Sequence, residues 1–155
     1  MASLEHIHPM LVHFPIVFFL TLAVVDTVAT LRGAPVTGRT GLGHASTGLA
    51  VLAALFAIAS FMFGDMALEF AESKGFTSEV AELHEHLGMA SAAAFTVWAI
   101  VRLVAWWRNA SWGGGGALGL VLVELAGALL VITTAYYGGQ LVYDLGVNVT
   151  QAMAG

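Results

Sequence analysis

The chain has 155 residues, of which 59% are hydrophobic and only 10% are charged. About a quarter of the residues of an ordinary soluble domain are charged, so this composition indicates a single membrane domain over residues 1–155. The net charge of −5 argues against nucleic acid as a partner, and the absence of cysteine excludes disulfides, iron–sulfur ligation and covalent c-type haem attachment.

Four apolar segments are each long enough to cross roughly 30 Å of hydrocarbon, which takes about 20 helical residues. They run over residues 10–31, 44–63, 87–107 and 117–137. None of them alternates as a strand would, and a spanning chain must satisfy its backbone hydrogen bonds internally. The sequence therefore predicts an all-α, four-helix transmembrane bundle.

The first segment opens with Pro9 in its first turn, and Pro15 is expected to kink it near His13. Its apolar run is too long for a signal peptide, and the residues ahead of it carry only Glu5 as a full charge. We therefore expect this segment to be retained as a membrane span.

Loop charges predict the orientation of the bundle. The first and third loops are basic, with Arg32, Arg39 and Arg108, whereas the second loop is acidic. The acidic side chains of the second loop are Glu69, Glu72, Glu79 and Glu82, against a single Lys74. The positive-inside rule then places both termini on the outer, periplasmic side of a bacterial inner membrane. Residues 138–155 are expected to form a tail on that outer surface.

Three ionisable residues, Asp26, Arg102 and Glu124, lie in the inner halves of the predicted helices. Such residues are rare at membrane depth, and they face a partner or a cavity. Because they lie at similar distances from the inner ends of their helices, we predict an Asp26–Arg102 ion pair with Glu124 nearby. A structural clamp is the simplest interpretation, and a proton path or a polar substrate site is the alternative.

If Asp26 and Arg102 lie at the same depth in the membrane, the depths of two histidines can be compared. The first and third helices run in the same direction, and His8 and His84 each precede their ionic partner by 18 residues (8 to 26 and 84 to 102). That separation is about five turns of an α-helix, so each histidine also shares a face with its ionic partner. His8 and His84 are therefore predicted to lie at the same depth, facing the interior.

The remaining four histidines carry weaker expectations. His86 points away from the interior face of its helix, and the proline kink leaves the direction of His13 open. His44, on the inner side, and His6, ahead of the first helix, are interpreted as interfacial histidines without a ligand.

Three interpretations of the histidine clusters "HIHPMLVH" and "HEH" remain open. In the first, one histidine from each cluster ligates a haem b iron near the outer leaflet, as helix bundles allow. In the second, His8, His13, His84 or His86 bind copper or zinc, and the thioether of Met10 favours cuprous copper. In the third, they bind nothing. The side chains expected to line a haem slot or to hydrogen-bond its propionates are Phe14, Phe18, Phe95, Gly88, Ala90, His86, Tyr136, Tyr137 and Gln140.

The stretches "IHPMLVHFPIVFF" and "GGQLVYDLGVNV" carry a resemblance to a known family. The chain resembles the bacterial four-helix membrane family of domain of unknown function 2231, which opens roughly H-P-x-x-V-H-F-P-I and closes G-G-x-L-V-Y-x-H-G-V-x-V. The positions carried over are His8, Pro9, His13, Pro15, Gly138, Gly139, Leu141, Val142 and Tyr143. Leu145 stands where the family often has histidine, so any tail ligand of relatives is missing here.

The resemblance implies a membrane haem b protein or an accessory subunit of a redox chain. Electron transfer to a periplasmic c-type cytochrome attracted by the acidic loop is the expected role, in a homo-oligomer or as a subunit of a respiratory complex. The sequence contains no constellation typical of a substrate-converting enzyme. The alternative is a haem-free structural or assembly subunit, with or without a copper or zinc site.

Overall fold

A computed structural model describes residues 7–147. Within that range the chain is helical and has no strand. Its elements are α1 (Ile7–Leu11), α2 (His13–Leu31), α3 (Gly41–Ser73), α4 (Glu79–Trp107) and α5 (Gly115–Tyr143). Because α1 and α2 together form one apolar span, the chain has four apolar helices of 25 to 33 residues, each long enough to cross a membrane. The predicted all-α four-helix architecture is confirmed.

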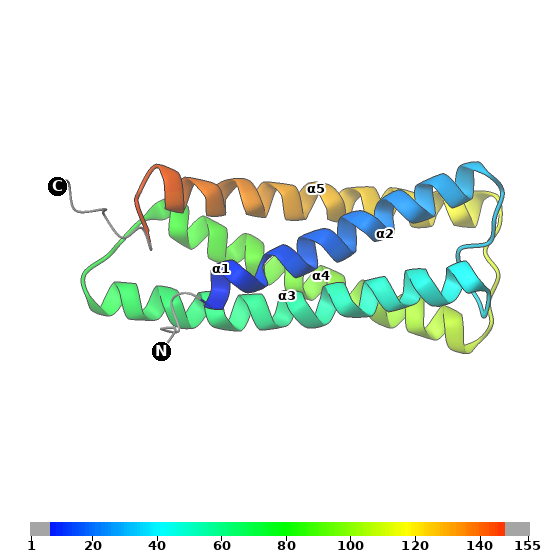
Figure 1. Cartoon of the computed structure of the whole chain (residues 1–155), viewed down its shortest axis with the longest axis horizontal. Helices are drawn as coiled ribbons and strands as arrows, with labels where there is room; N and C mark the ends of the chain where they lie inside the picture. Colours follow the sequence, from blue (N-terminus) through cyan, green and yellow to red (C-terminus); the bar gives the residue numbers. More distant parts are fainter. Residues whose placement is uncertain (1–6, 148–155) are drawn as a thin grey trace.

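The four spans run up and down along one long axis (Figure 1). Each helix packs against its neighbours in sequence, and α5 closes the ring against α2, so α2 and α4 face each other diagonally. The end of the bundle where α1 begins and α5 finishes is called the terminal end below. The opposite end, which carries residues 32–40 and 108–114, is called the two-loop end.

Helix boundaries differ from the predicted spans, most of all in α3, which continues to Ser73, ten residues beyond the predicted end at 63. The first span breaks at Val12, between α1 and α2, close to the expected proline kink. The cap of α4 is Ser78, whose hydroxyl accepts from the backbone N–H of Ala81 at 3.4 Å. Helix α5 continues to Tyr143, so residues 138–143 extend the last helix, whereas 148–155 of the predicted tail lie outside the described residues.

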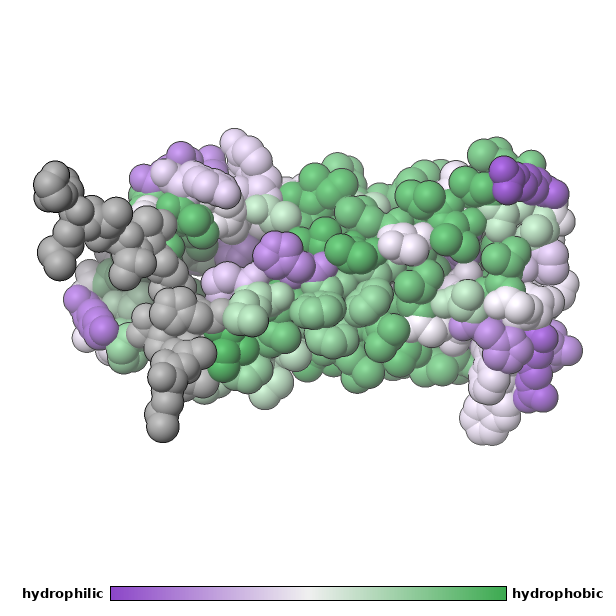
Figure 2. All heavy atoms as spheres, viewed as in Figure 1, coloured by the Kyte–Doolittle hydropathy of each residue, from purple (hydrophilic) through white to green (hydrophobic). Residues whose placement is uncertain are grey.

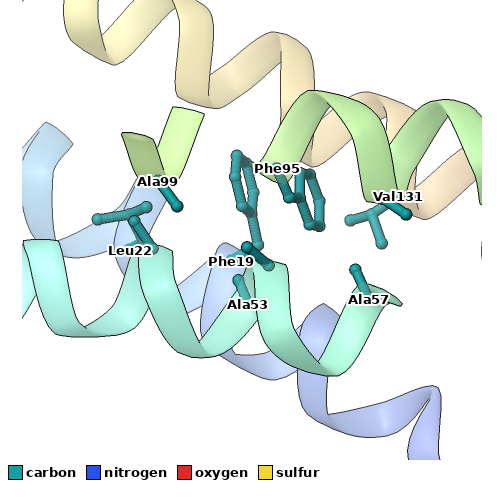
Figure 3. Packing of buried hydrophobic residues seen from close by; sticks show 10 residues of the cluster. Phe19, Leu22, Ala53, Ala57, Phe95, Ala99 and Val131 are labelled. Atoms are coloured by element: carbon teal, nitrogen blue, oxygen red, sulfur yellow. The ribbon is translucent and has the colours of Figure 1, made fainter. Parts of the chain in front are cut away.

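The middle of the bundle is filled by a cluster of small and aromatic side chains (Figure 3). Phe19 of α2 and Phe95 of α4 stack face to face, with ring centroids 3.8 Å apart. A Cβ added to Gly127 of α5 would lie 2.5 Å from the Phe19 ring, so this glycine makes room for the stack. The remaining buried members are Leu22, Ala50, Ala53, Ala54, Ala57, Ala92, Ala99 and Val131. These small residues let the helix backbones approach closely.

The two loops at the two-loop end fold against each other. The Arg39 guanidinium donates to the Trp107 carbonyl at 3.0 Å, and its backbone N–H donates to the Asn109 side chain at 2.8 Å. Thr37, which is buried, accepts from the backbone N–H of Trp112 at 2.9 Å. The loops therefore close this end of the bundle.

The surface of the bundle suits a bilayer. Figure 2 shows hydrophobic residues covering the middle of the visible face, with hydrophilic residues gathered toward the two ends. Large apolar side chains such as Val24, Leu55, Val97 and Leu129 are more than half exposed. An aqueous solvent would penalise this surface, whereas hydrocarbon does not.

Candidate histidine site and buried ionic cluster

His8 of α1 and His84 of α4 lie next to each other near the terminal end. Their ring centroids are 6.1 Å apart and the ring planes are nearly perpendicular, at 81°. Both side chains are partly buried. The structure thus brings together the two histidines that the residue count places at one depth.

Each imidazole is fixed by a hydrogen bond to a main-chain carbonyl of a neighbouring helix. His8 Nδ1 lies 2.7 Å from the carbonyl oxygen of Ser60 in α3, and His84 Nδ1 lies 3.0 Å from that of Thr134 in α5. A carbonyl oxygen can only accept, so each Nδ1 carries the hydrogen and donates it. In the neutral imidazole the lone pair then lies on Nε2, for which no hydrogen bond is found within residues 7–147.

A glycine one helical turn beyond each carbonyl makes these bonds possible. Gly64 follows Ser60 by four residues, and Gly138 follows Thr134 by four. A Cβ on Gly64 would lie 2.8 Å from two ring atoms of His8, and a Cβ on Gly138 would lie 2.8 Å from Cε1 of His84. Because residues four apart share a helix face, the missing side chain opens the carbonyl to the ring.

The two halves of the site are therefore built in the same way. A histidine on the first helix of each hairpin lies in a glycine notch and donates to a Ser or Thr carbonyl on the second helix. In the α5 half, the Thr134 hydroxyl also lies 3.1 Å from the Ser91 hydroxyl of α4, which joins the two helices below His84. In the α3 half, the hydroxyl of Ser60 is buried and has no partner within residues 7–147.

The separation of the rings matches that of two ligands on one metal ion. A metal–imidazole bond is about 2.0 Å long and the nitrogen lies about 1.1 Å from the ring centre, so two imidazoles across one metal have centroids roughly 6.2 Å apart. The observed 6.1 Å fits that arrangement. Between residues 7 and 147 no group of three or more His, Cys, Asp or Glu side chains is positioned to hold a metal ion. His8 and His84 therefore lie together as a pair and not as part of a larger cluster of such side chains within that range.

The other histidines are not brought into the pair. His13 and His86 are exposed on the outside of the bundle. His44 lies at the two-loop end, where its Nδ1 is 2.5 Å from the Thr40 carbonyl and its ring meets Trp106 edge-on at 5.8 Å. His6 lies outside the described residues. Of the four candidate ligands, the geometry supports His8 and His84 and disfavours His13 and His86.

Several side chains expected around a haem lie elsewhere. Phe95 belongs to the central stack, and Gly88 faces Phe61, which a Cβ would meet at an ordinary 3.8 Å. Phe14 is 45% exposed and stacks on Phe56 at 4.7 Å. Phe18 lies 5.7 Å from the same Phe56 ring, and Ala90 is exposed. Phe14, Phe18 and Phe56 thus form a partly exposed aromatic cluster, whereas Phe95 lies in the core.

The polar side chains proposed for propionates lie near the same end of α5. The Tyr136 and Tyr137 rings meet edge-on at 5.5 Å, and the Gln140 amide donates to the Tyr136 hydroxyl at 3.4 Å. Tyr136 is exposed, so its hydroxyl is accessible from outside the bundle. These three residues share the segment that contains Gly138.

A second buried cluster occupies the other half of the bundle. Arg102 Nη2 lies 2.7 Å from Asp26 Oδ2, and Arg102 Nη1 lies 3.7 Å from Glu124 Oε1. All three side chains are at most 1% exposed. The Ser46 hydroxyl donates to Asp26 Oδ1, and Trp98 Nε1 donates to Glu124 Oε1 at 3.1 Å. The ion pair and the third carboxyl lie together as the sequence predicts.

Fold and sites define a class of protein: a four-helix membrane bundle with a fixed histidine pair near one end and a buried ionic cluster toward the other. The family model described as predicted membrane protein (DUF2231) matches residues 5–151, so the chain belongs to this family. The resemblance carried by the opening and closing motifs is thereby confirmed. Comparisons with curated proteins and with solved structures gave no match.

Proposed function

We propose that this protein is a membrane b-type cytochrome, in which His8 and His84 are the two axial ligands of haem b. The proposal depends on one observation. Two imidazoles from different spans lie 6.1 Å apart, each held through Nδ1 so that Nε2 is free. Placing neutral imidazoles inside a membrane without a ligand costs free energy. This cost favours a bound haem or metal over an unliganded histidine pair.

The donor set fits haem. Haem iron takes two axial imidazoles in b-type proteins and then supplies one-electron chemistry, with a potential set by its ligands and surroundings. The chain contributes the Nδ1–H bonds to Ser60 and Thr134, which orient the rings and raise the basicity of Nε2. Tyr136 and Gln140, on the same helix end, are the proposed partners for propionates.

We further propose that the terminal end lies on the periplasmic side of a bacterial inner membrane. The support is the distribution of loop charges: Arg32, Arg39 and Arg108 lie at the two-loop end. Exposed carboxylates lie at the terminal end, among them Glu69, Glu72, Glu79 and Glu82. An acidic rim beside the histidine pair would attract a cationic redox partner such as a c-type cytochrome.

The visible spectrum of the purified protein, before and after dithionite, tests the haem proposal. We expect a b-type alpha band that sharpens on reduction. His8→Ala and His84→Ala should each abolish or strongly change this band. His13→Ala and His86→Ala are matched controls on the same two spans and should leave it intact. A band that survives in both His8→Ala and His84→Ala, or that the controls lose equally, contradicts the assignment.

A second candidate, a haem-free subunit of a respiratory complex that binds cuprous copper, is favoured by the same pair of neutral imidazoles. Two neutral imidazoles whose ring centroids lie 6.1 Å apart are a donor set that can ligate one soft ion without a third ligand. A colourless protein that carries stoichiometric copper, lost in His84→Ala, would replace the cytochrome proposal. A colourless and metal-free protein would contradict both proposals, and a structural subunit would be the remaining interpretation.

A further inference from the structure

The buried ionic cluster has unequal numbers of positive and negative groups. Asp26 and Glu124 both carry carboxyl groups, and within residues 7–147 Arg102 supplies the only guanidinium in contact with them. Their exposed fractions are 0%, 0% and 1%. If all three were ionised, the cluster would carry one net negative charge in the apolar half of a membrane bundle. An unpaired charge in such a place is among the most costly arrangements in a protein.

No other charged group within the described residues offsets this charge. The neighbours from each packed element are Ser46 of α3, Trp98 of α4 and the Val36 carbonyl, which accepts from Arg102 Nη2 at 3.1 Å. All of these are neutral. Arginine keeps its charge in proteins, so the cluster becomes neutral only when one carboxyl group holds a proton.

The contacts differ between the two carboxyl groups. Asp26 has the close ion pair at 2.7 Å on Oδ2 and a hydroxyl donor on Oδ1, which is the environment of a carboxylate. Glu124 lies 3.7 Å from the guanidinium, 1.0 Å farther than Asp26, and receives one indole N–H on Oε1. Its Oε2, like Oδ2 of Asp26, is buried without a hydrogen-bond partner in residues 7–147. Glu124 is therefore the weaker carboxylate of the two.

We propose that Asp26, Arg102 and Glu124 form a proton-binding site in the membrane interior, with the proton on Glu124 Oε2. The Phe19–Phe95 stack and its surrounding alanines separate this site from the histidine pair. On the other side, the Thr30 hydroxyl lies one helical turn beyond Asp26 and is buried without a partner among the described residues.

Infrared spectroscopy tests this proposal through the C=O stretch of a protonated carboxyl group, which shifts in D₂O. Charge balance predicts the intensity in each variant. The wild-type protein should show one buried protonated carboxyl. Glu124→Gln should show none, because the Asp26–Arg102 pair is already neutral. Asp26→Asn should also show none, because Glu124 then ionises and pairs with Arg102. Arg102→Met should show twice the wild-type intensity.

Two outcomes would overturn the proposal. Wild-type and Glu124→Gln spectra that are identical in this region would mean that Glu124 is ionised. A band that persists unchanged in Asp26→Asn would mean that charge balance does not set the protonation. Glu124→Gln preserves side-chain shape, and its thermal midpoint in detergent should stay close to that of the wild-type protein. This test involves no haem, so its result is independent of the proposed cytochrome function.

Discussion

Replacing Gly138 by alanine is expected to weaken the histidine site without unfolding the bundle. The new Cβ would lie 2.8 Å from Cε1 of His84, whereas ordinary contacts of this kind begin near 3.4 Å. The ring must therefore retreat from α5 by about 0.6 Å. The carbonyl of Thr134 lies on the same face of α5, so this movement lengthens the 3.0 Å Nδ1–O bond to about the limit of a hydrogen bond.

The size of the effect follows from the lost bond. Removing a hydrogen bond that orients a ligating histidine costs about 10- to 100-fold in metal affinity, which is about 1.4 to 2.7 kcal/mol. Overpacking adds about 1–3 kcal/mol of destabilisation. Alanine is also a better helix former than glycine by about 0.8–1 kcal/mol, which partly offsets the clash. The net result is a folded protein with a weakened site.

Gly139→Ala provides the matched control. It makes the same substitution at the next position of α5, where the new Cβ would meet only Tyr143 at 4.0 Å. Haem titration into apoprotein, together with the thermal midpoint of the apoprotein, compares the two variants. Gly138→Ala should bind haem at least tenfold more weakly than Gly139→Ala and should melt at a lower temperature. Equal affinities and equal midpoints would refute the role given to the glycine notch.

Three further predictions concern stability, measured by reversible unfolding in mixed micelles. Arg102→Met should destabilise the bundle by about 3–5 kcal/mol, because Asp26 loses its buried partner. Adding Asp26→Asn should restore part of that loss. If the losses of the two single variants simply add in the double variant, the result would count against the ion pair. Phe95→Ala should lower the free energy of unfolding by about 3–5 kcal/mol, because it leaves a cavity in the central stack. A loss below about 1 kcal/mol would show that the helices move together and fill the cavity. Trp98→Phe should cost about 1–3 kcal/mol by leaving Glu124 Oε1 without its donor, whereas an unchanged midpoint would make that bond dispensable.

The sequence predicts the pairing of His8 with His84 and of Asp26 with Arg102 because both rest on helical geometry. Two spans that run in the same direction keep a constant offset, so residues 76 positions apart (8 and 84, 26 and 102) lie level across the bundle. Phe19 and Phe95 have the same offset and stack between them. One ion pair at membrane depth therefore fixes the axial alignment of the first span with α4 along their whole length.

What the sequence did not reveal are the partners on the intervening helices. Ser60 and Thr134 accept hydrogen bonds through their main-chain carbonyls. Every residue has such a carbonyl, so residue type does not predict which one will accept. The spacing signal exists in "SFMFG" and "TAYYG", where a small polar residue precedes a glycine by four. Its meaning depends on which helix packs beside which histidine, and only the tertiary arrangement supplies that. The burial of Val36 and Thr37 in the loop at 32–40 also depends on the tertiary arrangement.

Three residue pairs between the first span (α1 and α2) and α4 divide the bundle into parts with different chemistry. They are His8–His84, Phe19–Phe95 and Asp26–Arg102. At the terminal end, the proposed haem ligands His8 and His84 are two imidazoles that are each held through Nδ1. At the other level, Arg102 and its carboxyl partners hold charges and donors but no soft or imidazole ligand. The Phe19–Phe95 level between them consists of apolar side chains that are almost fully buried. Such a layer offers ions and water no polar groups to bind, so it would separate the proposed haem site from the proposed proton site.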